Sequence, residues 1–246
     1  MTYLASSKLS LAVLGNLGFA CTLCTYKLIT KIFLGALREA EIEHVNDRLS
    51  QSVVESCLAM TIFREDMGAW SLALFVLLSF AKALHWLLAD RVDFVGTAPS
   101  LPPRTHVGLV GLGVGLLILD CAALHLALAQ TLRHGVSVHL LFAFECTVVA
   151  SAAAAALVKY VLAVTDTLLE GRWSGRGVAR FYLDLALDLL HLCVYVAFFA
   201  AVFSTYGIPL HLLRDVYSTA RGLHRRVRDF LRYRRLTANM DARFAD

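Results

Sequence analysis

Several ionisable side chains lie within stretches of the chain that are otherwise apolar. Asp184, Asp188 and His191 follow one another at intervals of four and three residues, so on a helix they share one face. Carboxylate and imidazole groups arranged in this way can bind a cation, relay protons or border a water-filled path. Other apolar stretches contain Lys82, His85, Lys159 and Glu55. We predict that these four residues and the first three line one polar cavity. An isolated charge in lipid costs about 2.5 to 3.5 kcal/mol, so we expect these residues to have a function.

The elements that hold these residues are predicted to be membrane-spanning helices. Hydrophobic residues make up 58% of the chain and charged residues only 17%, whereas the apolar share of soluble domains is about 45–50%. A helix needs about 20 apolar residues to cross a bilayer. This requirement predicts an all-α, polytopic bundle with crossings near residues 8–30, 70–89, 106–130, 138–165 and 178–205. We expect one transmembrane domain over 1–223 and a basic cytosolic tail over 224–246.

Two further segments are more polar. Residues 32–49 form an amphipathic pattern that should lie flat at the membrane interface and lead into a short crossing over 50–63. The apolar side of that helix would consist of Leu34, Leu37, Ile42, Val45 and Leu49. Segment 206–223 contains Pro209, Arg214 and Asp215, so it can cross only if protein or water shields its polar face. Including both segments, we predict seven crossings.

The distribution of Lys and Arg predicts the orientation of the bundle, because positive residues accumulate on the cytosolic side of short loops. With seven crossings and a cytosolic tail, only Lys8, Arg64 and Arg133 fall on the opposite side. We therefore expect a lumenal or external amino terminus and a cytosolic carboxyl terminus. Five intramembrane charges then fall in the cytosolic halves of three helices: Lys82, His85, Lys159, Asp184 and Asp188. This clustering predicts a hydrated vestibule that is open to the cytosol.

Motifs of intramembrane hydrolases are absent from the sequence. It has no HExxH zinc motif and no GxGD motif beside Asp184 or Asp188, and Ser174 lies in a GRWSG loop. A cation or proton transporter stays open as an alternative, because His and Asp side chains from several helices can bind a cation. Its candidate residues are His85, His125, His139, Asp184 and His191. The six cysteines lie inside predicted spans, where we expect small apolar thiols and no disulfides.

Specific sequence elements occur over nearly the whole chain. They are LREAEIEH at 37–44, ESCLAMTIFRED at 55–66, KALHWLLADRVDF at 82–94 and GVSVHLLFAFE at 135–145, followed by Lys159–Tyr160 and Arg234–Arg235. In this order they resemble the membrane domain of the Hrd1/synoviolin family, which comprises RING-type E3 ubiquitin ligases of endoplasmic-reticulum-associated degradation. The family-motif residues are Arg38, Glu41, His44, Trp86, Asp90, Arg91, Asp93, Asp120 and Glu145. A sister ligase, the autocrine motility factor receptor, is the relative most easily confused with this family.

The resemblance implies a multi-pass domain in the endoplasmic reticulum membrane. Such a domain would have a cytosol-facing polar cavity with a lateral opening, through which misfolded polypeptides are retrotranslocated. The implied partners are Hrd3/SEL1L-like and Derlin-like membrane proteins, the misfolded clients, the lipid bilayer and a second copy of the chain in a homodimer, but no nucleic acid. A docking-only scaffold, which would bind partners yet tolerate loss of every cavity charge, stays open as an alternative.

Two departures from the family pattern bear on activity. Family members begin with one more membrane helix, and residues 1–30 resemble their second helix. The family's RING, which holds two zinc ions and recruits the ubiquitin-conjugating enzyme (E2), is expected after Met240, yet no cysteine follows Cys193. We therefore expect this chain to bind no cofactor or metal and not to transfer ubiquitin by itself.

Overall fold

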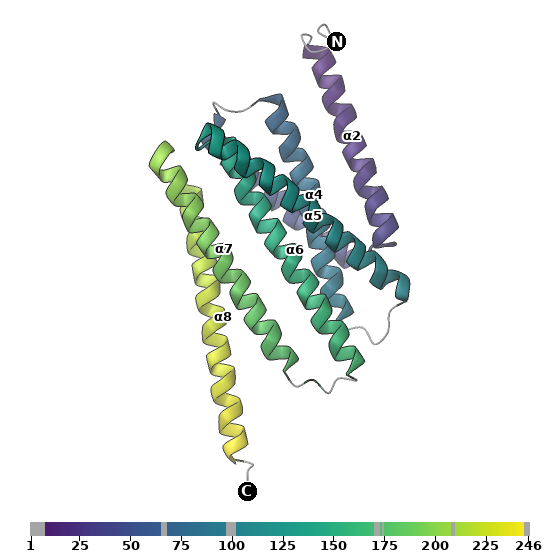
Figure 1. Ribbon diagram of the computed structural model, residues 1–246, viewed down its shortest axis with the longest axis vertical. Helices are drawn as coiled ribbons and strands as arrows, with labels where there is room; N and C mark the ends of the chain where they lie inside the picture. The colour runs from purple at the N-terminus through teal and green to yellow at the C-terminus, as the bar shows by residue number, and fades with distance from the viewer. Residues whose placement is uncertain are drawn as a thin grey trace. The chain divides into compact units, whose positions relative to one another are not determined.

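The computed structural model describes residues 8–64, 68–96, 102–169, 173, 175–207 and 210–243. Within these ranges it contains seven α-helices and no strand (Figure 1). The helices are α2 (Lys8–Phe33), α3 (Glu39–Ile62), α4 (Ala69–Val95), α5 (Pro103–His134), α6 (Val138–Leu168), α7 (Arg176–Tyr206) and α8 (Leu210–Arg243). The all-α prediction is therefore confirmed.

Five of these helices are long and apolar enough to cross a membrane. The candidate spans are Ala12–Phe33, Ala69–Val95, Pro103–His134, Val138–Leu168 and Arg176–Tyr206, and each coincides with a predicted crossing. The α2 span has none of its most apolar window buried by the rest of the chain, which is the expected state of a helix surrounded by lipid. The two more polar helices, α3 and α8, are not among the candidates, so their crossings stay predictions.

The junction between α2 and α3 differs from the prediction. Gly35 has a φ of 72°, a left-handed conformation that glycine adopts at little cost, and it follows the end of α2. Arg38 and Glu41 then form a reciprocal capping interaction that starts α3, which runs without a break to Ile62. The helix predicted over 32–49 is therefore wrong at its start, and no break separates it from segment 50–63.

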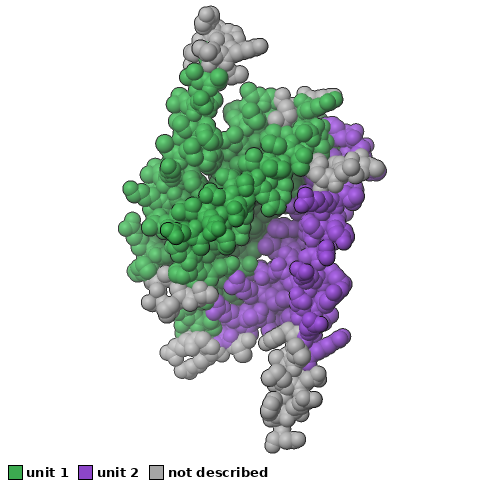
Figure 2. All heavy atoms as spheres, turned by 180° about the vertical axis from the view of Figure 1, so that it is seen from behind, with its two compact units in different colours: residues 1–169 green, residues 170–246 purple. Residues whose placement is uncertain are grey.

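The chain divides into two compact units, residues 1–169 and 170–246, which Figure 2 shows in different colours. In the first unit α4 is the central helix, because it contacts α2, α3, α5 and α6. Leu87 and Leu88 of α4 are buried against Leu109 and Leu112 of α5 in one hydrophobic cluster. The central position of α4 explains why its polar residues reach partners on several neighbouring helices.

The second unit is a helical hairpin. Helices α7 and α8 pack against each other on either side of Gly207, whose φ of 90° permits the turn. Helix α8 passes through residue 223 and continues to Arg243. The predicted boundary between membrane domain and tail therefore falls inside a helix, and it stays a prediction.

Two glycines of α5 allow neighbouring helices to approach it closely. A side chain on Gly108 would collide with the carbonyl oxygen of Phe33, so the start of α5 can touch the end of α2 only because residue 108 lacks a Cβ atom. Similarly, a Cβ atom on Gly113 would lie 2.6 Å from the side chain of Leu157 in α6. Residues 108 and 113 lie about 140° apart around α5, so these contacts place α2 and α6 against different sides of it.

Candidate functional site

Lys82 of α4 forms an ion pair inside the first unit. Its Nζ atom lies 2.8 Å from the Oε2 atom of Glu145 on α6, and the exposed fractions of the two side chains are 12% and 13%. The same ammonium group donates a hydrogen bond of 3.3 Å to the hydroxyl of Ser52 on α3. Lys82 therefore links three helices, and its charge is compensated within the bundle.

One turn further along α4, His85 is bound to Asp120 of α5. The Nε2 atom of the imidazole lies 2.7 Å from the Oδ2 atom of the carboxylate, and both side chains are almost fully buried. The other ring nitrogen, Nδ1, donates a hydrogen bond to the carbonyl oxygen of Ala81, which can only accept. The bond to Asp120 therefore needs a second proton, held by the imidazole or by the carboxyl group. In either form the pair carries no net charge, which suits an apolar bundle.

The carboxyl-terminal end of α4 is tied to the start of α3. Arg91 donates hydrogen bonds to Glu41, at 2.9 Å, and to the carbonyl oxygen of Ala36, at 3.2 Å. Arg38 binds the same carboxylate at 3.0 Å, and its guanidinium lies 3.9 Å from the centre of the Phe94 ring. Glu41 is thus buried between two arginines, and this cluster fixes the turn between α2 and α3.

The remaining family-motif residues lie near the same end of α4. Asp90 forms ion pairs with His44, at 3.6 Å, and with Arg48, at 3.4 Å. Trp86 is half-buried and packs against the hydrophobic cluster, while Asp93 is exposed. The HWLLADRVDF element at 85–94 therefore presents polar groups to α5 on one side and to α3 on another. These contacts hold α3, α4 and α5 together.

The second unit contains its own ionic cluster. Arg226 of α8 lies 3.3 Å from Asp184 and 2.8 Å from Asp188 of α7. These side chains keep exposed fractions of 21% for Asp184, 25% for Asp188 and 40% for Arg226. One turn away, the rings of Phe181 and Phe230 stack at a centroid distance of 3.8 Å. The spacing of Asp184 and Asp188 thus allows one guanidinium to bind both carboxylates.

A polar hollow lies beside this cluster on the α7–α8 hairpin. It has a volume of about 380 Å³ and is lined by Asp188, His191, Tyr195, Ser218, Thr219, Gly222, Leu223 and Arg226. The α7 members come from the face predicted from the sequence, whereas the α8 members had no expected role. Carboxylate, imidazole, phenol, hydroxyl and guanidinium groups together can hydrogen-bond a polypeptide backbone or water. We define these residues as the hairpin hollow.

The structure divides the predicted polar cavity between the two units. Lys82 and His85 lie in the first unit and are paired with acidic residues there. Lys159 is half-buried in α6, and Glu55 is exposed on α3, where its carboxylate accepts a hydrogen bond of 2.9 Å from Gln51. Asp184, Asp188 and His191 belong to the second unit. Hydration of the whole set therefore stays a prediction.

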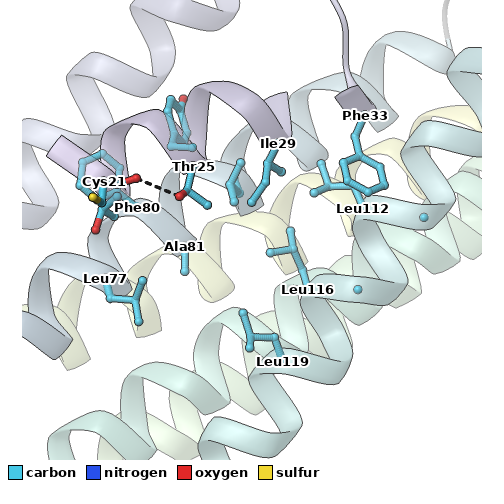
Figure 3. Close-up of a pocket in the computed structure, with 15 residues that line it drawn as sticks. Cys21, Thr25, Ile29, Phe33, Leu77, Phe80, Ala81, Leu112, Leu116 and Leu119 are labelled. Atoms are coloured by element: carbon cyan, nitrogen blue, oxygen red, sulfur yellow. Dashed lines mark hydrogen bonds between the residues drawn. The ribbon is translucent and has the colours of Figure 1, made fainter. Parts of the chain in front are cut away.

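A larger cavity of about 510 Å³ lies between α2, α4 and α5 (Figure 3). Its lining is mainly apolar and includes Ile29, Phe80 and Leu116. The hydroxyl of Thr25 points back to its own helix and donates to the carbonyl oxygen of Cys21 at 2.8 Å, as Figure 3 shows. The cavity therefore has the chemistry of a hydrocarbon site, and none of the predicted polar-cavity residues lines it.

A metal-binding transporter and a RING would both need clustered His, Cys, Asp or Glu ligands. In the described part of the chain, no group of three or more His, Cys, Asp or Glu side chains is placed to hold a metal ion. The histidines proposed for a transporter are dispersed; His85 binds Asp120, and His139 lies beside His134 with ring centroids 6.1 Å apart. All six cysteines are free. The residues present do not fit a zinc-binding RING.

The comparison with known families settles the relationship. A family model described as "E3 ubiquitin-protein ligase synoviolin-like, TPR repeats" matches residues 1–239. The chain belongs to the synoviolin-like family. The resemblance carried by the HWLLADRVDF element and its neighbours is thereby confirmed. A synoviolin-like chain with five candidate spans is a multi-pass membrane protein.

The family description also mentions TPR repeats, which are helix–turn–helix units of 34 residues. In this synoviolin-like chain a single helix, α8, has 34 residues, and α5 has 32. The length of α5, which is a candidate span, suits membrane crossing, because 20 residues already span about 30 Å.

Proposed function

We propose that this chain is the membrane-embedded part of an Hrd1-like E3 ubiquitin ligase of endoplasmic-reticulum-associated degradation. Its task would be to provide a polar, laterally open path along which misfolded polypeptides leave the membrane toward the cytosol. Membership of the synoviolin-like family and the five candidate spans support this proposal. The carboxyl terminus would be cytosolic, as the distribution of Lys and Arg predicts.

The observation that carries the proposal is the hairpin hollow. A polypeptide that enters a bilayer exposes backbone N–H and C=O groups, each of which costs several kcal/mol when it is left without a hydrogen-bond partner. The hollow offers donors and acceptors beside an apolar helix: Asp188 and His191 from α7, and Ser218 and Thr219 from α8. We infer that this face of the hairpin forms a wall of the path.

The buried pairs of the first unit have a different role in this proposal. Lys82 and His85 are compensated by Glu145 and Asp120 at distances of 2.8 and 2.7 Å, and none of the four side chains is more than 13% exposed. They therefore stabilise the bundle and leave few groups for a client to bind. The first unit would then act as a frame. We expect it to receive Hrd3/SEL1L-like and Derlin-like membrane proteins, and a second copy of the chain, on its exposed apolar surfaces.

Ubiquitin transfer belongs to another element in this proposal. A RING needs a dense series of Cys and His ligands for two zinc ions, and the cysteine with the highest number in this sequence is Cys193. We assign E2 binding and zinc to such a RING and assign client passage to the helices described above.

Site-specific crosslinking tests the proposed path. A photoreactive amino acid would replace Thr219, in the hairpin hollow, or Leu213, an exposed residue of α8 outside it. Each variant would be expressed in a ligase that carries a RING, together with a misfolded lumenal client stalled during degradation. We expect client adducts at residue 219 at several times the yield at residue 213.

Equal yields at the two positions would contradict a path along the hollow. Absence of client adducts at both, with normal recovery of Hrd3/SEL1L-like and Derlin-like partners, would favour the docking-only scaffold.

A further inference from the structure

The arginines of α8 lie on two different sides of the helix. Arg226 faces α7, where it binds Asp184 and Asp188. A second group, which we call the arginine stripe, has the spacing i, i+4, i+7 and i+11 and consists of Arg221, Arg225, Arg228 and Arg232. At 100° per residue its members fall within about 60° of one another and are centred about 130° around the helix from Arg226. All members of the stripe are exposed.

The surface next to the stripe is apolar. Leu213, Tyr217 and Leu231 fall along its edge on the helical projection, and their exposed fractions are 48%, 64% and 48%. Between residues 210 and 235 the sequence has eight arginines and only two acidic residues, Asp215 and Asp229. The outer face of α8 therefore combines an excess of positive charge with exposed apolar side chains.

The pairing with α7 sets the depth of the stripe relative to a bilayer. Residues 189–206 of α7 contain no Asp, Glu, Lys or Arg, and this stretch is about 27 Å long, close to the thickness of the hydrocarbon core. Asp188 marks the end of the stretch and binds Arg226. Arg225 and Arg228 therefore lie within a turn of the edge of the hydrocarbon, at the depth of the lipid headgroups.

We propose that the arginine stripe binds the headgroups of anionic phospholipids, while Leu213 and Tyr217, which precede the stripe on the membrane side of α8, contact the neighbouring acyl chains. Guanidinium groups bind phosphate through two parallel hydrogen bonds, which gives them an advantage over ammonium groups. A lipid surface fits better than an acidic protein, because the cations lie at headgroup depth and have apolar neighbours. This inference rests on α7 crossing the membrane and does not depend on client passage.

Native mass spectrometry of the full chain in mild detergent tests the proposal. Phosphatidylserine or phosphatidylcholine would be titrated into the wild-type chain and into the triple variant Arg225→Gln, Arg228→Gln, Arg232→Gln. Because each basic side chain near an anionic surface strengthens binding about fivefold, we expect the triple variant to bind phosphatidylserine about a hundredfold more weakly. Binding of phosphatidylcholine should not change.

A control with the same change in net charge replaces three exposed arginines of the first unit, Arg64, Arg104 and Arg133, by glutamine. It should keep the preference for phosphatidylserine. A version of the stripe with three lysines separates charge from guanidinium geometry and should lose only about twofold to threefold. Circular dichroism would check that every variant keeps its helix content.

Equal weakening in the stripe variant and in the control would overturn the proposal, because binding would then follow net charge alone. Unchanged phosphatidylserine binding in the stripe variant, combined with lost binding of a polyglutamate peptide, would also overturn it and would indicate an acidic protein as the partner. Loss of client crosslinking at Thr219 together with intact lipid preference would refute the proposed path and leave the lipid site standing.

Discussion

The ion pair between Lys82 and Glu145 allows a sharp test of the first unit as a closed frame. The perturbation is a cycle of three variants: Lys82→Met, Glu145→Gln and the double variant. If the two side chains neutralise each other inside the bundle, each single variant leaves one charge without its partner. If Lys82 instead faces water, as a hydrated vestibule would require, either single change should have little effect.

The size of the effect follows from the burial of the pair. Its atoms lie 2.8 Å apart, and both side chains are almost nine-tenths buried. Breaking a buried ion pair costs about 3–5 kcal/mol, and an unpaired charge at the centre of a bilayer costs about 2.5–3.5 kcal/mol. In Glu145→Gln the hydroxyl of Ser52 still binds Lys82, so we expect a loss of about 3 kcal/mol. Lys82→Met leaves the Glu145 carboxylate without its cation and should cost about 3–5 kcal/mol. The double variant removes both charges and should lie within about 1.5 kcal/mol of the wild type.

The assay is reversible unfolding of the purified chain in mixed micelles of increasing SDS content, followed by helical circular dichroism. Glu55→Gln provides a matched control, because Glu55 is exposed on α3 and accepts a hydrogen bond from the neighbouring Gln51. We expect this variant to lose less than about 0.5 kcal/mol of stability. The reasoning would be refuted by additive effects in the cycle, or by a Glu145→Gln variant as stable as the control. Either result would restore Lys82 to a water-facing vestibule.

Two further predictions address other parts of the chain. Arg91→Ala should destabilise the protein by about 2–4 kcal/mol in the same assay, because it leaves the buried carboxylate of Glu41 with Arg38 alone. The control Arg48→Ala removes an exposed contact to Asp90 and should cost less than about 1 kcal/mol. Equal losses of stability in the two variants would contradict the buried cluster. A glycosylation acceptor beside Gly135 should be modified in the endoplasmic reticulum, whereas one placed within residues 97–105 should not. Modification of the second site alone would invert the predicted topology.

Much of the helical framework was predictable because hydrophobic length alone defines a crossing. The expected crossings at 70–89 and 138–165 lie inside α4 and α6. The start of α3 was missed because it depends on two local features that hydropathy does not report. One is the left-handed backbone of Gly35, and the other is the capping interaction between Arg38 and Glu41.

The partners of the polar residues were harder to predict. Asp120 and Glu145 were recognised as family-motif residues, but the sequence does not contain the helix register that pairs them with His85 and Lys82. One signal was available, since two basic residues, Lys82 and His85, lie on one predicted span, and single acidic residues, Asp120 and Glu145, lie on the next two spans. This arrangement suggests that they compensate one another. Arg226 had no such signal, because its role depends on how α8 folds back along α7.

The two units differ in how far their charged side chains are paired, and this difference indicates which charges need water or lipid phosphate. In the first unit Lys82 and His85 meet Glu145 and Asp120, so these buried groups can remain in lipid as neutral pairs. In the second unit Arg226 is compensated, but Arg221 and the rest of the arginine stripe face outward in excess over acidic residues. Such an excess is stable only beside water or lipid phosphate. The described charges that still require water or lipid phosphate therefore lie on the outer face of α8, whereas the buried charges of the first unit require neither.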